Sequence, residues 1–77
     1  MNRNEVLEKI INVFATMSEV EEITEESELL EDLELSSIDV FSLLATLETE
    51  FSITIPEKMI RKMVTVEDVA DIVIDLM

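Results

Sequence analysis

Two adjacent serines, Ser36 and Ser37, stand between a run of carboxylates and a strongly apolar helical pattern in the stretch LEDLELSSIDVFSLL. Ser36 and Asp39 form an S-x-x-D pattern, which is typical of a helix N-cap that bonds reciprocally to the backbone. Ser37 then falls at the first helical position, where the cap does not need its hydroxyl. The start of a helix presents unpaired N–H groups and a partial positive charge, so a phosphodiester formed on Ser37 is favoured there.

The residue types that would activate this hydroxyl are missing from the chain. It contains no cysteine, histidine, tyrosine, tryptophan or glycine, which excludes disulfides, thiolate metal sites, Cys or His nucleophiles and glycine-rich phosphate loops. Another enzyme would therefore have to modify Ser37. Carboxylate pairs such as Glu48 with Glu50 have no partner base, so we do not expect an enzyme. From the residues alone, an ordinary surface serine remains the alternative for Ser37.

Composition bounds the class of protein. The 77 residues predict one small domain, residues 1–77, and the balance of 19 acidic against 5 basic residues gives a net charge of -14. This field opposes contact with nucleic acid and anionic lipid and favours basic protein surfaces as partners. No apolar run is long enough to span a membrane. We expect a monomeric, cytoplasmic protein.

The first half of the chain predicts one amphipathic helix and one acidic loop. Helical spacing over Glu5 to Met17, with Asn4 as the expected N-cap, places on one face the residues Val6, Leu7, Ile10, Ile11, Phe14 and Met17. From Ser18 to Glu34, nine of the seventeen residues are acidic. We expect an ordered loop there, pinned to the bundle by its leucines, because a long structureless connection is uncommon in a compact domain.

The second half predicts three more helices. The helix that begins at the serines and reaches Phe51 has a wide apolar arc and is expected to be the central, most buried one. Pro56 is expected at the first position of a short helix through Met63. Thr65 and Asp68 resemble a capping box that opens a last helix, whose expected buried side is Val66, Val69, Ala70, Val73, Leu76 and Met77. The fold class is all-α: a small four-helix bundle of three longer helices plus one short helix.

From Leu29 onward the chain resembles the acyl carrier protein family. DLELSSID is similar to the family's Asp-Leu-Gly-x-Asp-Ser-Leu-Asp, LETEFSITIP to its Leu-Glu-Glu-Glu-Phe-x-Ile-x-Ile-Pro, and TVEDVADIV to its closing helix. The resemblance covers about residues 29–73, and the first helix more loosely. Three segments in one spacing fix the register, so the family's modified serine falls on Ser37.

This resemblance implies a function. A phosphopantetheinyl transferase would move 4'-phosphopantetheine from coenzyme A onto Ser37, and the terminal thiol would carry acyl groups as thioesters. A chain without cysteine needs such an imported thiol. The expected partners are this transferase and the acyl-loading, condensing and modifying enzymes, which have basic docking patches. Ile38 is expected to anchor the turn to the core, Asp39 to meet a basic residue of the transferase, and Ser42 and Glu48 to lie on the partner-facing surface.

The chain also departs from the family pattern. Ser36 replaces an Asp and is a minor rival for modification, and Glu34 replaces a Gly. Ser42 stands where an acid is usual, and basic residues occupy the third helix, which predicts a carrier for a restricted set of enzymes in fatty-acid or specialised biosynthesis. Phe41 falls where a smaller residue is common; it either narrows a chain pocket or fills core.

Two other classes of function are open to an acidic helical chain. An unmodified adaptor with a carrier-like fold is the leading alternative, although the serine and the helix start are both present. A calcium sensor is suggested by the carboxylates, but its binding loop requires a glycine that the chain lacks. Weak, nonspecific divalent binding by the acidic loop is the expectation instead.

Overall fold

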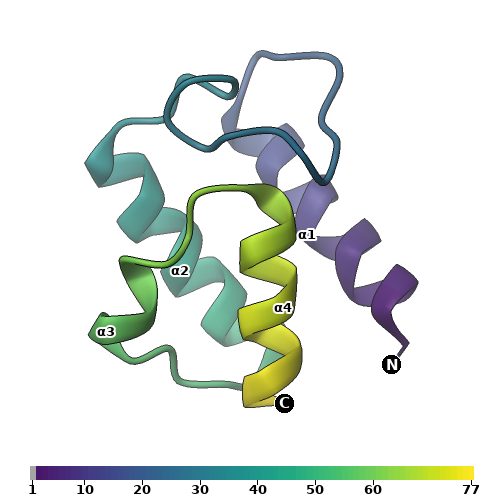
Figure 1. Cartoon of the computed structure of the whole chain (residues 1–77), viewed down its shortest axis with the longest axis vertical. Helices are drawn as coiled ribbons and strands as arrows, with labels where there is room; N and C mark the ends of the chain where they lie inside the picture. Colours follow the sequence, from purple (N-terminus) through teal and green to yellow (C-terminus); the bar gives the residue numbers. More distant parts are fainter. Residues whose placement is uncertain (1) are drawn as a thin grey trace.

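The computed structural model describes residues 2–77, which form four helices arranged as in Figure 1. Within this range there is no strand beyond an isolated bridge between Glu28 and Thr65. The helices are α1 (Arg3–Met17), α2 (Ser37–Phe51), α3 (Glu57–Ile60) and α4 (Val66–Leu76). The predicted all-α bundle of three longer helices and one short helix is confirmed. None of the described helices is long and apolar enough to cross a membrane.

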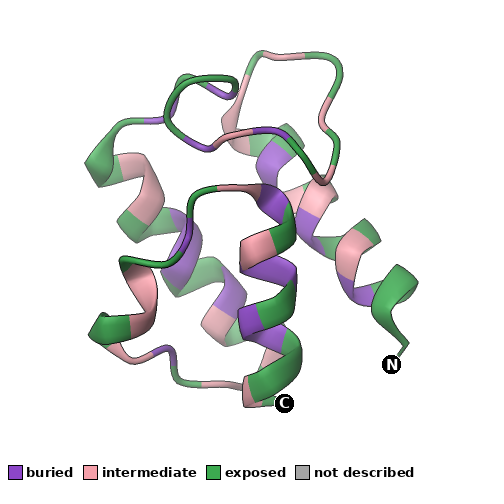
Figure 2. Ribbon diagram, in the orientation of Figure 1, coloured by how far each residue is buried: buried purple, intermediate pink, exposed green. Residues whose placement is uncertain are grey.

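The core lies where α4 packs against α1, with α2 closing the other side (Figure 2). Helix α4 buries five residues: Val66, Val69, Ala70, Ile72 and Val73. Helices α1 and α2 bury three each: Val6, Ile10 and Phe14, and Leu43, Leu44 and Leu47. The prediction that α2 is the most buried helix is therefore wrong. Near its start, Ile38 and Phe41 are exposed, so part of its apolar arc never reaches the core.

Helix ends follow the capping residues, with two corrections. The N-cap of α1 is Asn2 and not Asn4, because the Asn2 side chain accepts a hydrogen bond from the Glu5 N–H at 2.9 Å. Pro56 is the N-cap of α3 and not its first residue. This helix ends at Ile60, short of Met63, because the N–H of Met63 reaches back only three residues, to Ile60. The Thr65–Asp68 capping box is confirmed.

The acidic loop between α1 and α2 is ordered by hydrogen bonds to the start of α4. The carbonyls of Ser27 and Glu25 accept from the N–H groups of Val66 and Glu67 at 3.0 and 2.9 Å. The loop thus satisfies N–H groups that a helix start leaves unpaired. Buried Leu29 and Leu33 pin the loop as predicted, whereas Leu30 is 61% exposed, so the prediction is wrong for this residue.

The end of α4 also differs from its prediction. Ile72, which the expected face omitted, is buried, and Met77 is 54% exposed. On its outer side, α4 is tied to α1 by Arg3, whose guanidinium contacts Glu25, Glu67 and Asp71 at 2.9, 3.7 and 2.8 Å. These contacts are exposed, so each contributes little to stability.

Candidate functional site

The start of α2 is held by a reciprocal cap. The Ser36 Oγ accepts from the Asp39 N–H at 3.2 Å, and the Asp39 Oδ2 accepts from the Ser36 N–H at 3.0 Å. The predicted capping box is confirmed. Hydrogen bonds to Ser36, first of all the one from its backbone N–H, lower the pKa of Asp39 below its ordinary value.

Ser37 is the first residue of α2 and is exposed to solvent. Because Ser36 provides the cap, the Ser37 hydroxyl is not used by the helix start, and it forms no hydrogen bond with residues 2–77. Both predictions for this residue, its place in the helix and its outward position, are confirmed. An acceptor or a covalent substituent there lies near the partial positive charge of the helix N-terminus.

An apolar groove begins at Ser37. This cavity of about 240 Å³ is lined by Ser37 together with six apolar residues: Leu29, Leu30, Val40, Phe41, Ile60 and Met63. It joins three segments that are far apart in the sequence, namely the loop, α2 and the α3 region. Its walls are hydrocarbon and sulfur, so it is suited to an apolar chain and not to a charged one.

The residues predicted to contact partners lie at different distances from Ser37, and not all of them are as buried or as exposed as expected. Ile38 is 78% exposed, so the prediction that it anchors the turn to the core is wrong; it follows Ser37 on the outer side of the helix start. Ser42 is exposed one turn further along α2. Glu48 lies eleven residues from Ser37, about 16 Å along the helix axis. Its Oε2 accepts from the Ile55 N–H at 2.8 Å, so this carboxylate holds the chain after α2.

The structure changes the interpretation of Phe41 and adds residues that the sequence did not single out. Phe41 is 62% exposed, so the view that it fills core is wrong, and its ring lines the groove beside Ser37. Leu30, Ile60 and Met63 complete the groove. They come from the acidic loop, the last residue of α3 and the segment that follows it, where apolar periodicity gives no signal for which face is exposed.

The backbone before the serines is strained. Glu34 has a φ of 55°, in the left-handed region that favours glycine, and it is the position at which the resembling family has Gly. Leu35, next in the chain, is buried and donates its N–H to the Leu29 carbonyl at 3.1 Å. The turn at Glu34 therefore directs the chain into the core at Leu35 and out again at Ser36.

Comparisons with known proteins agree with this fold. Residues 5–73 match the family described as "Phosphopantetheine attachment site", which defines the class of phosphopantetheine-dependent carriers. The acyl carrier protein of Thermosynechococcus vestitus is 37% identical over 75 residues, covering 95% of this chain and 93% of the relative. That of Rubrobacter xylanophilus is 38% identical over 77 residues, covering 97% and 95%.

A solved structure of acyl carrier protein from Enterococcus faecalis superposes with a TM-score of 0.84 at 28% identity, covering 100% of both chains. The chain belongs to the acyl carrier protein family, as its resemblance indicated. Its cofactor is accordingly 4'-phosphopantetheine. The start of α2 fits this group, because an exposed, uncommitted hydroxyl lies at a helix N-terminus that favours a phosphate, beside a groove that accepts hydrocarbon.

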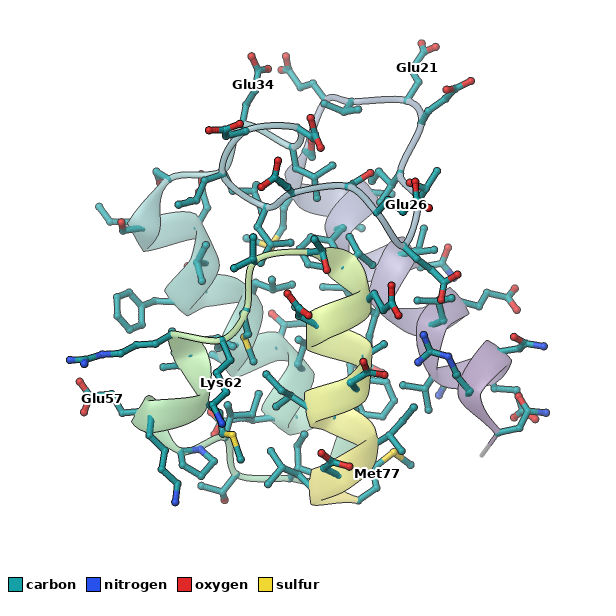
Figure 3. The ribbon with its side chains drawn as sticks, viewed as in Figure 1. Glu21, Glu26, Glu34, Glu57, Lys62 and Met77 are labelled. Atoms are coloured by element: carbon teal, nitrogen blue, oxygen red, sulfur yellow. The ribbon has the colours of Figure 1, made fainter. Side chains whose placement is uncertain are left out.

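No group of three or more His, Cys, Asp or Glu residues within residues 2–77 is arranged to hold a metal ion. Figure 3 shows why the acidic loop is a poor cage: Glu21, Glu26 and Glu34 project outward from separate points along it. Carboxylates that point apart into solvent cannot converge on one cation.

Proposed function

We propose that Ser37 is the attachment residue for 4'-phosphopantetheine and that the protein presents acyl groups as thioesters to biosynthetic enzymes. The observation that carries this proposal is that the two adjacent serines have different structural roles. Ser36 is committed to the capping box, whereas the hydroxyl of Ser37 is exposed and unused. The arm supplies the thiol that this cysteine-free chain lacks.

The attachment step fits the residues at the helix start. The Ser37 Oγ attacks the phosphorus of coenzyme A that bears the pantetheine, the phosphoanhydride bond breaks, and adenosine 3',5'-bisphosphate leaves. The hydroxyl proton passes to a base of the transferase, because the chain contains no histidine or cysteine. The new phosphodiester retains a negative charge, which the N-terminus of α2 stabilises. Ile38 and Asp39 are proposed contacts of the transferase beside this point.

The groove is proposed to receive the acyl chain. Leu30, Phe41, Ile60 and Met63 present an apolar surface that begins at Ser37, so a bound chain can fold back and leave water. The Phe41 ring lies in the wall and is expected to limit the length of chain that is shielded. The pathway is either fatty-acid synthesis or a specialised polyketide or lipid pathway, since the loading enzyme selects the cargo.

The first experiment is loading with coenzyme A and a broad-specificity phosphopantetheinyl transferase, read by intact mass and peptide mapping. We expect one phosphopantetheine on Ser37 of the wild-type chain and none on S37A. The S36A variant is the matched control. It should still load at Ser37 while losing about 1 kcal/mol of stability, because it removes an N-cap.

Two outcomes would contradict the assignment. Loading of S37A but not of S36A would place the arm on Ser36. No loading of the folded wild-type chain by several transferases would favour the unmodified adaptor. Circular dichroism of S37A should match the wild type, because the cap that starts α2 is intact in this variant.

We also propose that the carrier serves a restricted set of enzymes. Ser42 provides no charge where the family usually has an acid. The carboxylate of Glu48 accepts a hydrogen bond from the Ile55 N–H. Helix α2 therefore offers few free carboxylates to a basic docking patch. The loaded chain should therefore react slowly when it replaces the carrier of a standard fatty-acid synthase. Turnover at the normal rate would refute this part of the proposal.

A further inference from the structure

Three cations near α3 have no ion partner in a strongly acidic chain. Arg3 is bound by three carboxylates. In contrast, Lys58, Arg61 and Lys62 form no salt bridge with any residue of 2–77, and all three are exposed. They line one surface cleft with a single acid, Glu57, so positive charge exceeds negative charge here (Figure 3 labels Glu57 and Lys62 beside α3).

Beyond Asp39, the exposed side of α2 near Ser37 carries no charge that could neutralise this cluster. Between Asp39 and Glu48 the helix contains no charged residue. Asp39 is bonded within the capping box, and Glu48 is bonded to the Ile55 N–H. What this side presents instead is apolar, with Ile38 78% and Phe41 62% exposed.

The cations lie next to the proposed arm site. Leu30, Ile60 and Met63 line the groove at Ser37, and the same three residues line a neighbouring cavity of about 390 Å³ that also includes Arg61. The two hollows are therefore contiguous. Charge along this face runs from the acidic loop, where Glu34 projects (Figure 3), through the apolar groove to the basic α3 region.

We infer that enzymes acting on this carrier dock across the Ser37 groove with a surface of mixed charge, and that their carboxylates face Lys58, Arg61 and Lys62. Apolar side chains of the enzyme cover Ile38 and Phe41. Complementary charge between the two surfaces sets the orientation of the bound enzyme and its association rate, and like charges repel an enzyme that does not match. An enzyme with a uniformly basic patch meets repulsion at α3, which accounts for restricted partner choice. This inference rests on the proposed function only in naming the partner as an enzyme of the carrier cycle.

A protein partner fits better than a lipid surface. Anionic lipid would also attract three cations beside exposed apolar residues. However, a net charge of -14 repels such a membrane as a whole, and the loop acids Glu28 and Glu31 line the same cavity as Arg61. A protein surface can place basic and acidic groups separately, which a lipid surface of one sign cannot.

The test is a charge-swap experiment with the unmodified chain. The probe is a condensing enzyme of general fatty-acid synthesis that has a basic docking patch, together with variants in which its docking lysines and arginines are replaced one at a time by glutamate. Dissociation constants are measured by calorimetry at low salt. We expect at least one of these variants to bind the wild-type chain about tenfold tighter than the parent enzyme, and R61E to abolish that gain.

Lys9→Glu is the matched control. It makes the same change in charge at an exposed cation in the hollow between α1 and α2, which does not include Ser37. K9E should retain the gain that R61E loses. If no glutamate variant binds more tightly than the parent, or if K9E and R61E behave alike, the inference is overturned.

Binding to phosphatidylglycerol vesicles is measured in parallel. Vesicle binding that R61E abolishes would overturn the inference in favour of a lipid surface. Because the chain is used without its arm, the result is independent of loading at Ser37. If Ser37 is loaded with phosphopantetheine but no glutamate variant of the enzyme binds more tightly, the proposed function stays intact and only the docking inference is refuted.

Discussion

The α1–α4 pair and the face around Ser37 use apolar residues in opposite ways. In the pair, Phe14 and Val69 are fully buried, and α4 alone buries five residues. On the Ser37 face, α3 buries none, and Ile38 and Phe41 are mostly exposed. The pair stabilises the fold, whereas the Ser37 face leaves apolar surface exposed, which we propose receives a cargo or a partner. Exposed apolar side chains grouped in this way mark interaction sites.

The largest effect on stability is expected when the same substitution, Phe to Ala, is made once in each of the two regions. Phe14→Ala should cost about 3–5 kcal/mol, as for other buried aromatic residues. Because the single core of a domain of this size rarely supplies more than about 3–5 kcal/mol of net stability, this variant should be largely unfolded. Phe41→Ala should change the free energy of unfolding by well under 1 kcal/mol, since the ring is exposed. Urea denaturation followed by circular dichroism measures both.

Phe41→Ala has a second readout, which is the hydrolysis rate of thioesters on the loaded protein. Removing the ring opens the groove wall, so longer acyl chains should be better shielded than in the wild type. If Phe41→Ala were as destabilising as Phe14→Ala, the contrast between the two regions would fail. If the wild type already shielded long chains as well as short ones, Phe41 would not limit the chain.

The same contrast explains which parts of the fold followed from the sequence. Helical periodicity predicted Val6, Ile10 and Phe14 as one buried face, and both capping boxes were visible as a hydroxyl followed three residues later by an acid. Periodicity failed for α2. It detects apolar residues but not whether a neighbour covers them, so Ile38 was expected to contact the core, and Phe41 could be either pocket wall or core.

For the candidate site, the S-x-x-D pattern predicted Ser37 at the first position of α2, which the structure confirms. The register of the family resemblance predicted Ser37 as the modified serine, and this stays a prediction. The groove was not predictable, because Leu30 and Met63 come from segments without regular periodicity and meet only in the folded chain. The basic α3 cluster was visible as a departure from the family pattern. Its position beside the groove required the structure.

An intermediate effect is expected at Glu34, on the turn that leads into the Ser37 face. Its left-handed backbone costs a non-glycine residue about 1–2 kcal/mol. Glu34→Gly should therefore stabilise the protein by about 1 kcal/mol, reduced by the greater flexibility of glycine in the unfolded chain. The measurement is the midpoint of urea denaturation.

The variant Glu34→Ala distinguishes the effect of backbone strain on stability from the effect of removing the carboxylate charge. It removes the same carboxylate but keeps a Cβ in the left-handed region, so it should gain much less than Glu34→Gly. Equal gains in the two variants would assign the effect to relief of acidic repulsion, and the φ of 55° at this position would then carry no measurable strain.

The smallest expected effect concerns the polar cap that secures the Ser37 face. Asp39 has a pKa lowered from the ordinary 3.8 by hydrogen bonds to Ser36, so its charged form is favoured by folding. The stability that this charge contributes is present above pH 3.8 and is lost as the pH falls through the lowered pKa. Asp39→Asn keeps an acceptor but removes the charge. It should be less stable than the wild type at neutral pH, and the gap should close in acid.

Asp75→Asn is the control, because it removes one charge from an exposed carboxylate of α4 that accepts no side-chain hydrogen bond within residues 2–77. It should show no comparable gap at neutral pH. A gap for Asp39→Asn that persisted unchanged in acid would mean that Ser36 caps the helix without help from the charge. A gap that closes would show that the end of α2 bearing Ser37 is held by an ionised cap, in contrast to the start of α1, where the neutral amide of Asn2 caps a helix secured by buried Val6 and Ile10.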